Sequence, residues 1–293
     1  MTEQSLTPRS RLSDEALADL SELRRRHPRV FEESRRHLIV AAVAASLVAL
    51  AIFALIHFDF SWPRIAEGLG RLIDFTSRMF PPTDGGHTAT YVKALGETLA
   101  ISFLGTLTAA IFAFPFAFLA ARNVIPNFFL RFGARRILDT IRGVDTLVWA
   151  LIWVGVVGLG PFAGVLAIAC ADFGALGKLF SETIETADRK PIEGVTAAGG
   201  TRLEALRFGL VPQILPVIAS QILYFIESNT RSATVIGIVG AGGIGVHLAE
   251  QIRVLEMQQV SFLMLLILIA VASIDFISGK LRFAIIGRAA PLI

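Results

Sequence analysis

The sequence predicts an all-α integral membrane protein with about six transmembrane helices and both termini in the cytoplasm. Its 293 residues are 54% hydrophobic and 17% charged, whereas soluble domains carry roughly 25% charged residues. The mean hydropathy is +0.65, a value typical of membrane proteins. Long apolar runs without Asp, Glu, Lys or Arg occur at 38–56, 98–121, 146–171, 208–226, 232–249 and 257–274.

Four of these runs each fit one crossing, because a helix spans the hydrocarbon with about 20 residues at ~1.5 Å each. They are 38–56, 98–121, 208–226 and 257–274. The run at 146–171 is interrupted by GLGP at 158–161, where glycine and proline favour a tight turn. We therefore expect two helices there, at about 143–159 and 161–179.

The distribution of basic residues supports this topology. With six crossings, the cytoplasmic segments would be 1–37, 121–143, 178–207 and 276–293, and they hold 21 of the 27 Lys and Arg residues. Cytoplasmic loops of membrane proteins carry such an excess. The lipid bilayer, and no nucleic acid, is therefore the partner that the basic excess indicates.

The first 37 residues are polar, with arginines at 24–26 and 35–36. A cleavable signal peptide would place its apolar stretch nearer Met1, so the run at 38–56 is expected to remain as an anchor. Ser13 can cap a helix in which Leu17, Leu20 and Leu23 share a face. That helix either lies along the cytoplasmic membrane surface or forms a solvated tail.

The run at 232–249 is expected not to cross. It carries five glycines between 237 and 245, and glycine disfavours a continuous helix. We predict an outer-side or re-entrant segment that packs against the protein core or a partner subunit, because irregular backbone at membrane depth needs such cover. Its GAGGIG, 240–245, matches a dinucleotide fingerprint only in spacing, since no acid follows at about 20 residues.

The segment EGVTAAGGTRLEALRFGLVP, 193–212, is polar and lies between two apolar runs. A first short helix can end at Gly199 or Gly200 in a left-handed conformation. A second can start at Thr201, with Glu204 completing a capping box. We expect two short helices joined by glycine and exposed to the cytosol, which suits docking of another protein.

This segment resembles the EAA loop of permease subunits in binding-protein-dependent ABC importers. Glu193, Gly199 and Pro212 match the loop's E, G and P in identity and spacing, while Gly194 and Val195 replace its two alanines, and Gly209 and Val211 replace its I and L. The resemblance implies a loop, about 188–212, that docks on a cytoplasmic ATPase. The docking residues would be Glu193, Gly194, Ala197, Ala198, Gly199 and Gly200.

RMFPPTD, 78–84, and NTRSATVIGIVGAGGIG, 229–245, resemble the phosphonate-transport permeases of that superfamily. The resemblance implies a permease in the bacterial inner (plasma) membrane, with its transmembrane domain over 38–286 and cytoplasmic tails at 1–37 and 287–293. Its partners would be a second copy of itself, a cytoplasmic ABC ATPase dimer that binds ATP and Mg, and an extracytoplasmic solute-binding protein. No cofactor is expected in this chain, nor a metal site or any catalytic residue.

Arg231 is the most informative charge of the second half. Arginines at membrane depth line a polar cavity or pair with an acid, and an arginine among hydroxyls suits a phosphorus oxyanion. Arg231 either lines the pathway, pairs with Glu227 or anchors at the interface. The pathway residues we predict are Asn229, Thr230, Arg231, Ser232, Thr234, Gly240, Gly242 and Gly243.

Two alternatives stay open at this point. Asp172, inside an apolar run, either pairs with Lys178 or faces the pathway. The chain as a whole could also be a permease for methionine or an osmolyte, or a transporter that works without ATP.

Overall fold

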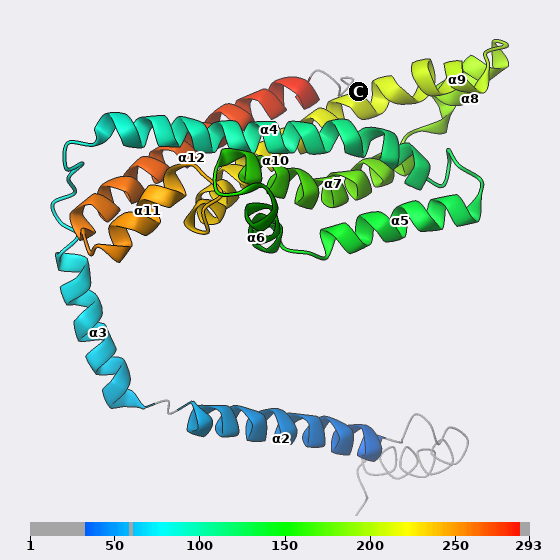
Figure 1. Cartoon of the computed structure of the whole chain (residues 1–293). Coiled ribbons are helices and arrows are strands. Elements are labelled where there is room, and N and C mark those ends of the chain that lie inside the picture. Colours follow the sequence, from blue (N-terminus) through cyan, green and yellow to red (C-terminus); the bar gives the residue numbers. More distant parts are fainter. Residues whose placement is uncertain (1–32, 59–60, 288–293) are drawn as a thin grey trace, which may run out of the picture. The chain divides into compact units, whose positions relative to one another are not determined.

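The computed structural model describes residues 33–58 and 61–287, and within these ranges the regular structure is helical (Figure 1). The described chain divides between Asp74 and Phe75 into two units. The expected transmembrane domain, 38–286, therefore includes residues of both units. The predicted N-terminal surface helix lies largely outside the described residues.

In the part that the structure describes, the first unit contains helix α2 and most of helix α3, which differ in character. Helix α2, Glu33–His57, includes 21 residues with a mean hydropathy of 2.9 and none buried within the protein. A helix that is apolar on all sides needs lipid around it, so α2 agrees with the expected anchor. Helix α3, Trp62–Ser77, is amphipathic, with Trp62, Ile65, Leu69 and Leu72 at helical spacing. This spacing suits a helix that lies in the membrane interface.

The second unit is built around two long parallel helices, α4, Thr88–Ala120, and α7, Pro161–Thr186. Alanines at 109, 113 and 117 of α4 are at most 1% exposed, so the packed face of this helix is made of small side chains. A Cβ added at Gly105 would lie 2.7 Å from Ile168. Small residues let membrane helices approach closely, and they set the α4–α7 pair as the centre of the unit.

The turn that the sequence predicted at 158–161 is confirmed. Gly158 and Gly160 have φ values of 91° and 135°, which only glycine adopts readily. Pro161 then begins α7, where its missing N–H costs nothing.

The helix before this turn is shorter than predicted, and another helix precedes it. Within 121–143, which was expected to be a cytoplasmic segment, residues 128–142 form helix α5, Phe128–Arg142, which packs along α7. The expected helix at 143–159 is the shorter α6, Thr146–Val157, because Asp145 caps its start and Gly158 ends it. The two helices meet at an angle of 86° and count as one bent span or a re-entrant pair.

The glycine-rich region corrects a second prediction. Helix α10 runs from Val211 to Ile238, so the first part of 232–249 continues the crossing instead of leaving it. A turn follows, and α11, Ile244–Arg253, packs back on α10. The turn is covered as expected: Ala241 is 0% exposed and the Gly160 N–H donates to the Gly240 carbonyl at 2.9 Å.

The last helix, α12, Met257–Gly287, packs mainly on α10. Its start is fastened to the segment before α4, where Ser261 Oγ donates to the Met79 carbonyl at 2.6 Å, and to α4 itself, where Tyr91 donates to Gln259 at 2.6 Å. Five described helices are long and apolar enough to cross a membrane, and the bent α5–α6 pair makes six. The predicted all-α membrane fold with about six crossings is confirmed.

Candidate functional site: the helical elbow and the polar core

The predicted docking segment forms an elbow of two short helices, α8, Arg189–Ala197, and α9, Arg202–Glu204. Gly199 separates them with φ +87°, and its N–H donates to the Thr196 carbonyl at 3.0 Å. The Thr201 N–H donates to the Glu204 carboxylate at 2.7 Å, and the Thr201 hydroxyl accepts from the Glu204 N–H at 3.4 Å. The left-handed glycine and the capping box are therefore confirmed.

The six predicted docking residues all lie on this elbow, but not in the same environment. Five of them are exposed: Glu193, Gly194, Ala197, Ala198 and Gly199. Gly200 is half-buried, and a Cβ there would lie 2.7 Å from the Val195 side chain and 2.8 Å from its carbonyl oxygen. The elbow thus presents a compact surface of small residues with one acid. Gly200 lies underneath this surface and packs against Val195.

A π-helical segment, Ala205–Leu210, joins the elbow to the start of α10. A Cβ added at Gly209 would lie 2.8 Å from the Ile192 Cα, so α8 and the π-helical segment touch at the backbone. Gln213 fastens the start of α8, since its side-chain oxygen accepts from the Asp188 N–H at 3.1 Å and its amide donates to the Asp188 carbonyl at 3.2 Å. These contacts join α8 to the start of α10.

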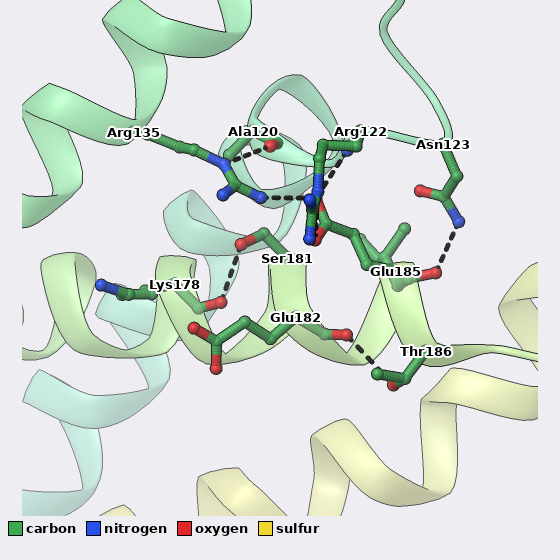
Figure 2. Close-up of polar contacts among 10 residues, drawn as sticks. Ala120, Arg122, Asn123, Arg135, Lys178, Ser181, Glu182, Glu185 and Thr186 are labelled. Atoms are coloured by element: carbon green, nitrogen blue, oxygen red, sulfur yellow. Dashed lines mark hydrogen bonds and ion pairs between the residues drawn. The ribbon is translucent and has the colours of Figure 1, made fainter. Parts of the chain in front are cut away.

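The end of α7 is tied to the segment after α4 by charge, as Figure 2 shows for Arg122 and Arg135 around Glu185. Glu185 is only 12% exposed in its side chain and accepts from Arg122 Nε at 3.1 Å and from Arg135 at 2.5 Å. Asn123 donates to the Ile184 carbonyl at 2.7 Å. Sequence analysis missed Glu185, because the two arginines that it binds are 50 and 63 residues away.

A polar core joins α4, α7 and α10 at the middle of the unit. Asp172 is 5% exposed and accepts from Thr106 at 3.1 Å and from Asn229 at 2.5 Å. The expected alternative, an Asp172–Lys178 pair, is wrong, since Lys178 donates to Asp139 at 2.9 Å. One turn away, Ser102 donates to the Ile226 carbonyl at 2.8 Å, so two adjacent layers of hydrogen bonds link α4 and α10.

The predicted pathway residues separate into two groups. Arg231 is exposed on α10 and has no hydrogen-bond or ion-pair partner among the residues that the structure describes. The proposed pair with Glu227 is wrong, because Glu227 accepts from Arg282 at 2.5 Å. Asn229, Thr230 and Thr234 are buried in helix packing, and Ser232 is half-buried.

The glycines of the predicted pathway support the turn after α10. A Cβ at Gly242 would lie 2.7 Å from the Pro161 Cα and N. Beside Gly243, the Ile244 N–H donates to Thr98 Oγ1 at 2.8 Å. Gly240 binds the 158–161 turn through its carbonyl. In this conformation these three glycines hold the turn after α10 against α4 and against the start of α7.

Membrane-length helices around a small-residue core, with a helical elbow between α7 and α10, define a multi-pass membrane protein. An inward-facing structure of the MetNI methionine ABC transporter superposes with a TM-score of 0.59 at 20% identity, over 67% of this chain and 95% of that chain. The family model described as binding-protein-dependent transport system inner membrane component matches residues 113–285. The chain belongs to this family of ABC importer permeases.

Two relatives place it in the phosphonate branch. A Stutzerimonas stutzeri protein named for phosphite transport is 40% identical over 252 residues, which cover 86% of this chain and 88% of the relative. An Escherichia coli protein named for phosphonate transport is 48% identical over 118 residues, which cover 40% of this chain and 97% of the relative.

Proposed function

We propose that this permease moves phosphonate, phosphite or phosphate across the inner membrane, along a pathway that forms between two copies of the chain. A solute-binding protein would deliver the oxyanion from the outer side. A dimeric ATPase, which binds ATP and Mg, would supply the energy from the cytoplasm. The names of the two relatives support the class of solute, and the exposed elbow supports the docking of a partner.

The elbow is the observation that carries the mechanism. Five of its six docking residues are exposed, while the backbone of α8 lies against Gly209 and, through Gln213, against the start of α10. A partner that grips α8 differently in its ATP-bound and nucleotide-free states would thereby bias the position of α10. A ligand shifts a conformational equilibrium only by such a difference in binding.

Arg231 supports the proposed pathway. It lies seven residues, or about 10 Å, before the end of α10 at Ile238, and it is exposed without a partner in the described part of the chain. An arginine at the centre of a membrane helix costs roughly 2.5–3.5 kcal/mol on insertion scales. Its exposed side therefore faces water or a second copy of the chain, where it can attract an oxyanion.

The test is ATP hydrolysis by the permease reconstituted in liposomes with its ATPase and binding protein. We expect phosphonate, phosphite or phosphate to stimulate hydrolysis, and methionine and betaine to have no effect. Glu193→Ala is expected to reduce the stimulation, with Glu256→Ala as a matched control because Glu256 is an exposed acid outside the elbow. Stimulation by methionine or betaine would reject the solute, and a permease that retains no ATPase would reject the coupling.

A further inference from the structure

We propose that Arg136 and Lys178 form a weak binding site for a phosphorus oxyanion, with Asp139 as the counter-ion that the oxyanion displaces. This α5–α7 site rests on the proposed function and adds a second solute-binding position to the pathway. It is separate from Arg231 on α10 and from the elbow.

The site is made by the close contact of α5 and α7. Leu138 of α5 is 1% exposed, and a Cβ at Gly177 of α7 would lie 2.5 Å from its side chain. At Gly174 a Cβ would lie 2.6 Å from the Arg142 backbone nitrogen. The two glycines therefore bring α5 against α7 at backbone distance, and the charged side chains beside Leu138 meet those of α7.

The central feature is a carboxylate held between two cations. Asp139 accepts from Arg136 and from Lys178, each at 2.9 Å. The three side chains are accessible, with exposed fractions of 61% for Arg136, 38% for Lys178 and 29% for Asp139. An arginine and a lysine that converge on one carboxylate can converge in the same way on a phosphorus oxyanion, which offers them more acceptor oxygens.

Beside the pair lies a recess of about 100 Å³, bordered by Arg135, Leu138, Ser181 and Glu182 as well as by the three charged residues. One water needs roughly 10–15 Å³ on this measure, so the recess has room for the four or five heavy atoms of phosphite or phosphate. Arg135 is engaged with Glu185. Arg136 and Lys178 share the more exposed Asp139, and they are the cations that an oxyanion can take over by displacing it.

The depth of the site argues for a watery surround. Helix α7 has 26 residues, and Lys178, the eighteenth, lies about 26 Å from its outer end at ~1.5 Å per residue. This position is near the inner edge of a hydrocarbon layer of about 30 Å. Figure 2 shows Lys178 and Glu182 on successive turns of α7. Several exposed charges at this depth require a water-filled cavity or lipid headgroups.

The counter-ion explains why such a site would pass a solute on. A bare pair of cations would hold an oxyanion tightly, whereas a conducting site must bind strongly enough to admit the solute and weakly enough to release it. Asp139 competes for the same donors, so the oxyanion gains only the difference between the two interactions. Arg136 and Lys178 thus donate the hydrogen bonds that bind the oxyanion, and competition from Asp139 limits the affinity.

The proposal is tested by uptake of radiolabelled phosphate or methylphosphonate into liposomes that contain the complete transporter. Lys178→Gln is expected to raise the half-saturating concentration about tenfold, the lower end of what a hydrogen bond to a charged group contributes. Asp139→Asn is expected to lower both that concentration and the maximal rate. A purely structural role would impair both variants in the same direction, and this outcome would overturn the site.

Two controls make the result specific. Lys93→Gln removes an exposed lysine of α4 that lies outside the recess, and it is expected to leave the half-saturating concentration within twofold. Lys178→Arg is expected to restore the wild-type value. Co-purification of the ATPase checks that each variant is assembled.

A lipid phosphate would satisfy the same donors, so a second arm distinguishes the two sources. Thermal stability of the detergent-solubilised transporter is measured while phosphatidylglycerol is added. If Lys178→Gln abolishes a stabilisation by this lipid and leaves uptake unchanged, the site belongs to a headgroup and the proposal is wrong. If the wild-type transporter takes up neither phosphate nor methylphosphonate, the proposed function itself is wrong, whatever the variants show.

Discussion

Two glycines at the elbow are required for opposite reasons. Gly199 has φ +87°, yet a Cβ there would meet nothing within 4 Å, so the position demands a backbone conformation and not space. Gly209 carries no positive φ, but a Cβ there would lie 2.8 Å from the Ile192 Cα and 3.0 Å from its nitrogen. Its requirement is close approach of two backbones.

Gly199→Ala isolates the conformational requirement. A left-handed conformation costs a residue with a Cβ about 1–2 kcal/mol, so we expect the elbow's affinity for the ATPase to fall about tenfold. Gly199→Asn is expected to recover part of the loss, because asparagine tolerates this conformation. The measurement is titration of the purified ATPase onto the permease in detergent.

The matched control is Gly279→Ala in α12. It adds the same methyl group in open space inside a helix, where alanine is favoured by up to about 1 kcal/mol. Its affinity for the ATPase should equal that of the wild type. Equal affinities for Gly199→Ala and Gly279→Ala would contradict a conformational role for Gly199.

These residues also mark how far the sequence could predict the site. Gly199, Thr201 and Glu204 act through neighbours three residues away, and a local pattern was enough to predict them. Gly209 acts through Ile192, Glu185 through Arg122, and Glu227 through Arg282. Such pairings depend on which helices become neighbours, and the local spacing of residues in one sequence does not show which helices these are.

At the scale of the element, α10 is held to α4 and α7 by its polar residues. Asn229 donates to Asp172 and, at 2.8 Å, to Thr106, and all three side chains are buried. In a membrane, where lipid and protein interior are equally apolar, hydrogen bonds and close packing specify which helix faces meet. The three residues therefore fix the rotation of α10, which the elbow is proposed to move.

A double-mutant cycle tests this role. Asn229→Leu removes donors from the buried Asp172, which we expect to cost about 1–3 kcal/mol in the free energy of unfolding. Asp172→Leu should cost a similar amount. The double variant should cost less than the sum of the two, because no buried carboxylate or amide is then left unpaired. Additive losses in thermal unfolding of the detergent-solubilised chain would show that the two residues do not act together.

Helix ends were harder to predict than helix existence. The run at 208–226 stopped at Glu227 in the sequence, whereas α10 continues to Ile238, since Arg282 neutralises Glu227 from another helix. The amphipathic 128–142 has no long apolar run at all, and its basic residues made it read as part of a cytoplasmic segment. It is a helix because Ala134 and Leu138 are buried against the rest of the unit.

For the whole molecule, the parallel course of α4 and α7 decides the number of crossings. Gly164, near the start of α7, approaches Ile101 in the middle of α4, and Glu185 near the end of α7 meets Arg122 just after the end of α4. The chain must therefore return between them, and within the described residues only the bent α5–α6 pair is available for that return. His87, before α4, and Ala198, after α7, consequently belong on opposite sides of the membrane.

Cysteine labelling tests this arrangement. In a Cys170→Ala background, which removes the single native thiol, His87→Cys and Ala198→Cys place one thiol at each exposed position. With the N-terminus in the cytoplasm, an impermeant maleimide should label His87→Cys on intact cells, and Ala198→Cys only in inverted membrane vesicles. The reverse pattern would place both termini outside.

Labelling of both positions from the same side would mean that α5–α6 does not cross. Ala198 would then lie on the side where α4 begins, although α4 and α7 run parallel. A cytoplasmic ATPase can reach the elbow only if three crossings, α4, α5–α6 and α7, separate the elbow from an external His87. That result would therefore contradict the coupling mechanism as well as the topology. Leu255→Cys, exposed between α11 and α12, serves as the internal control, because it should label from the same side as His87→Cys.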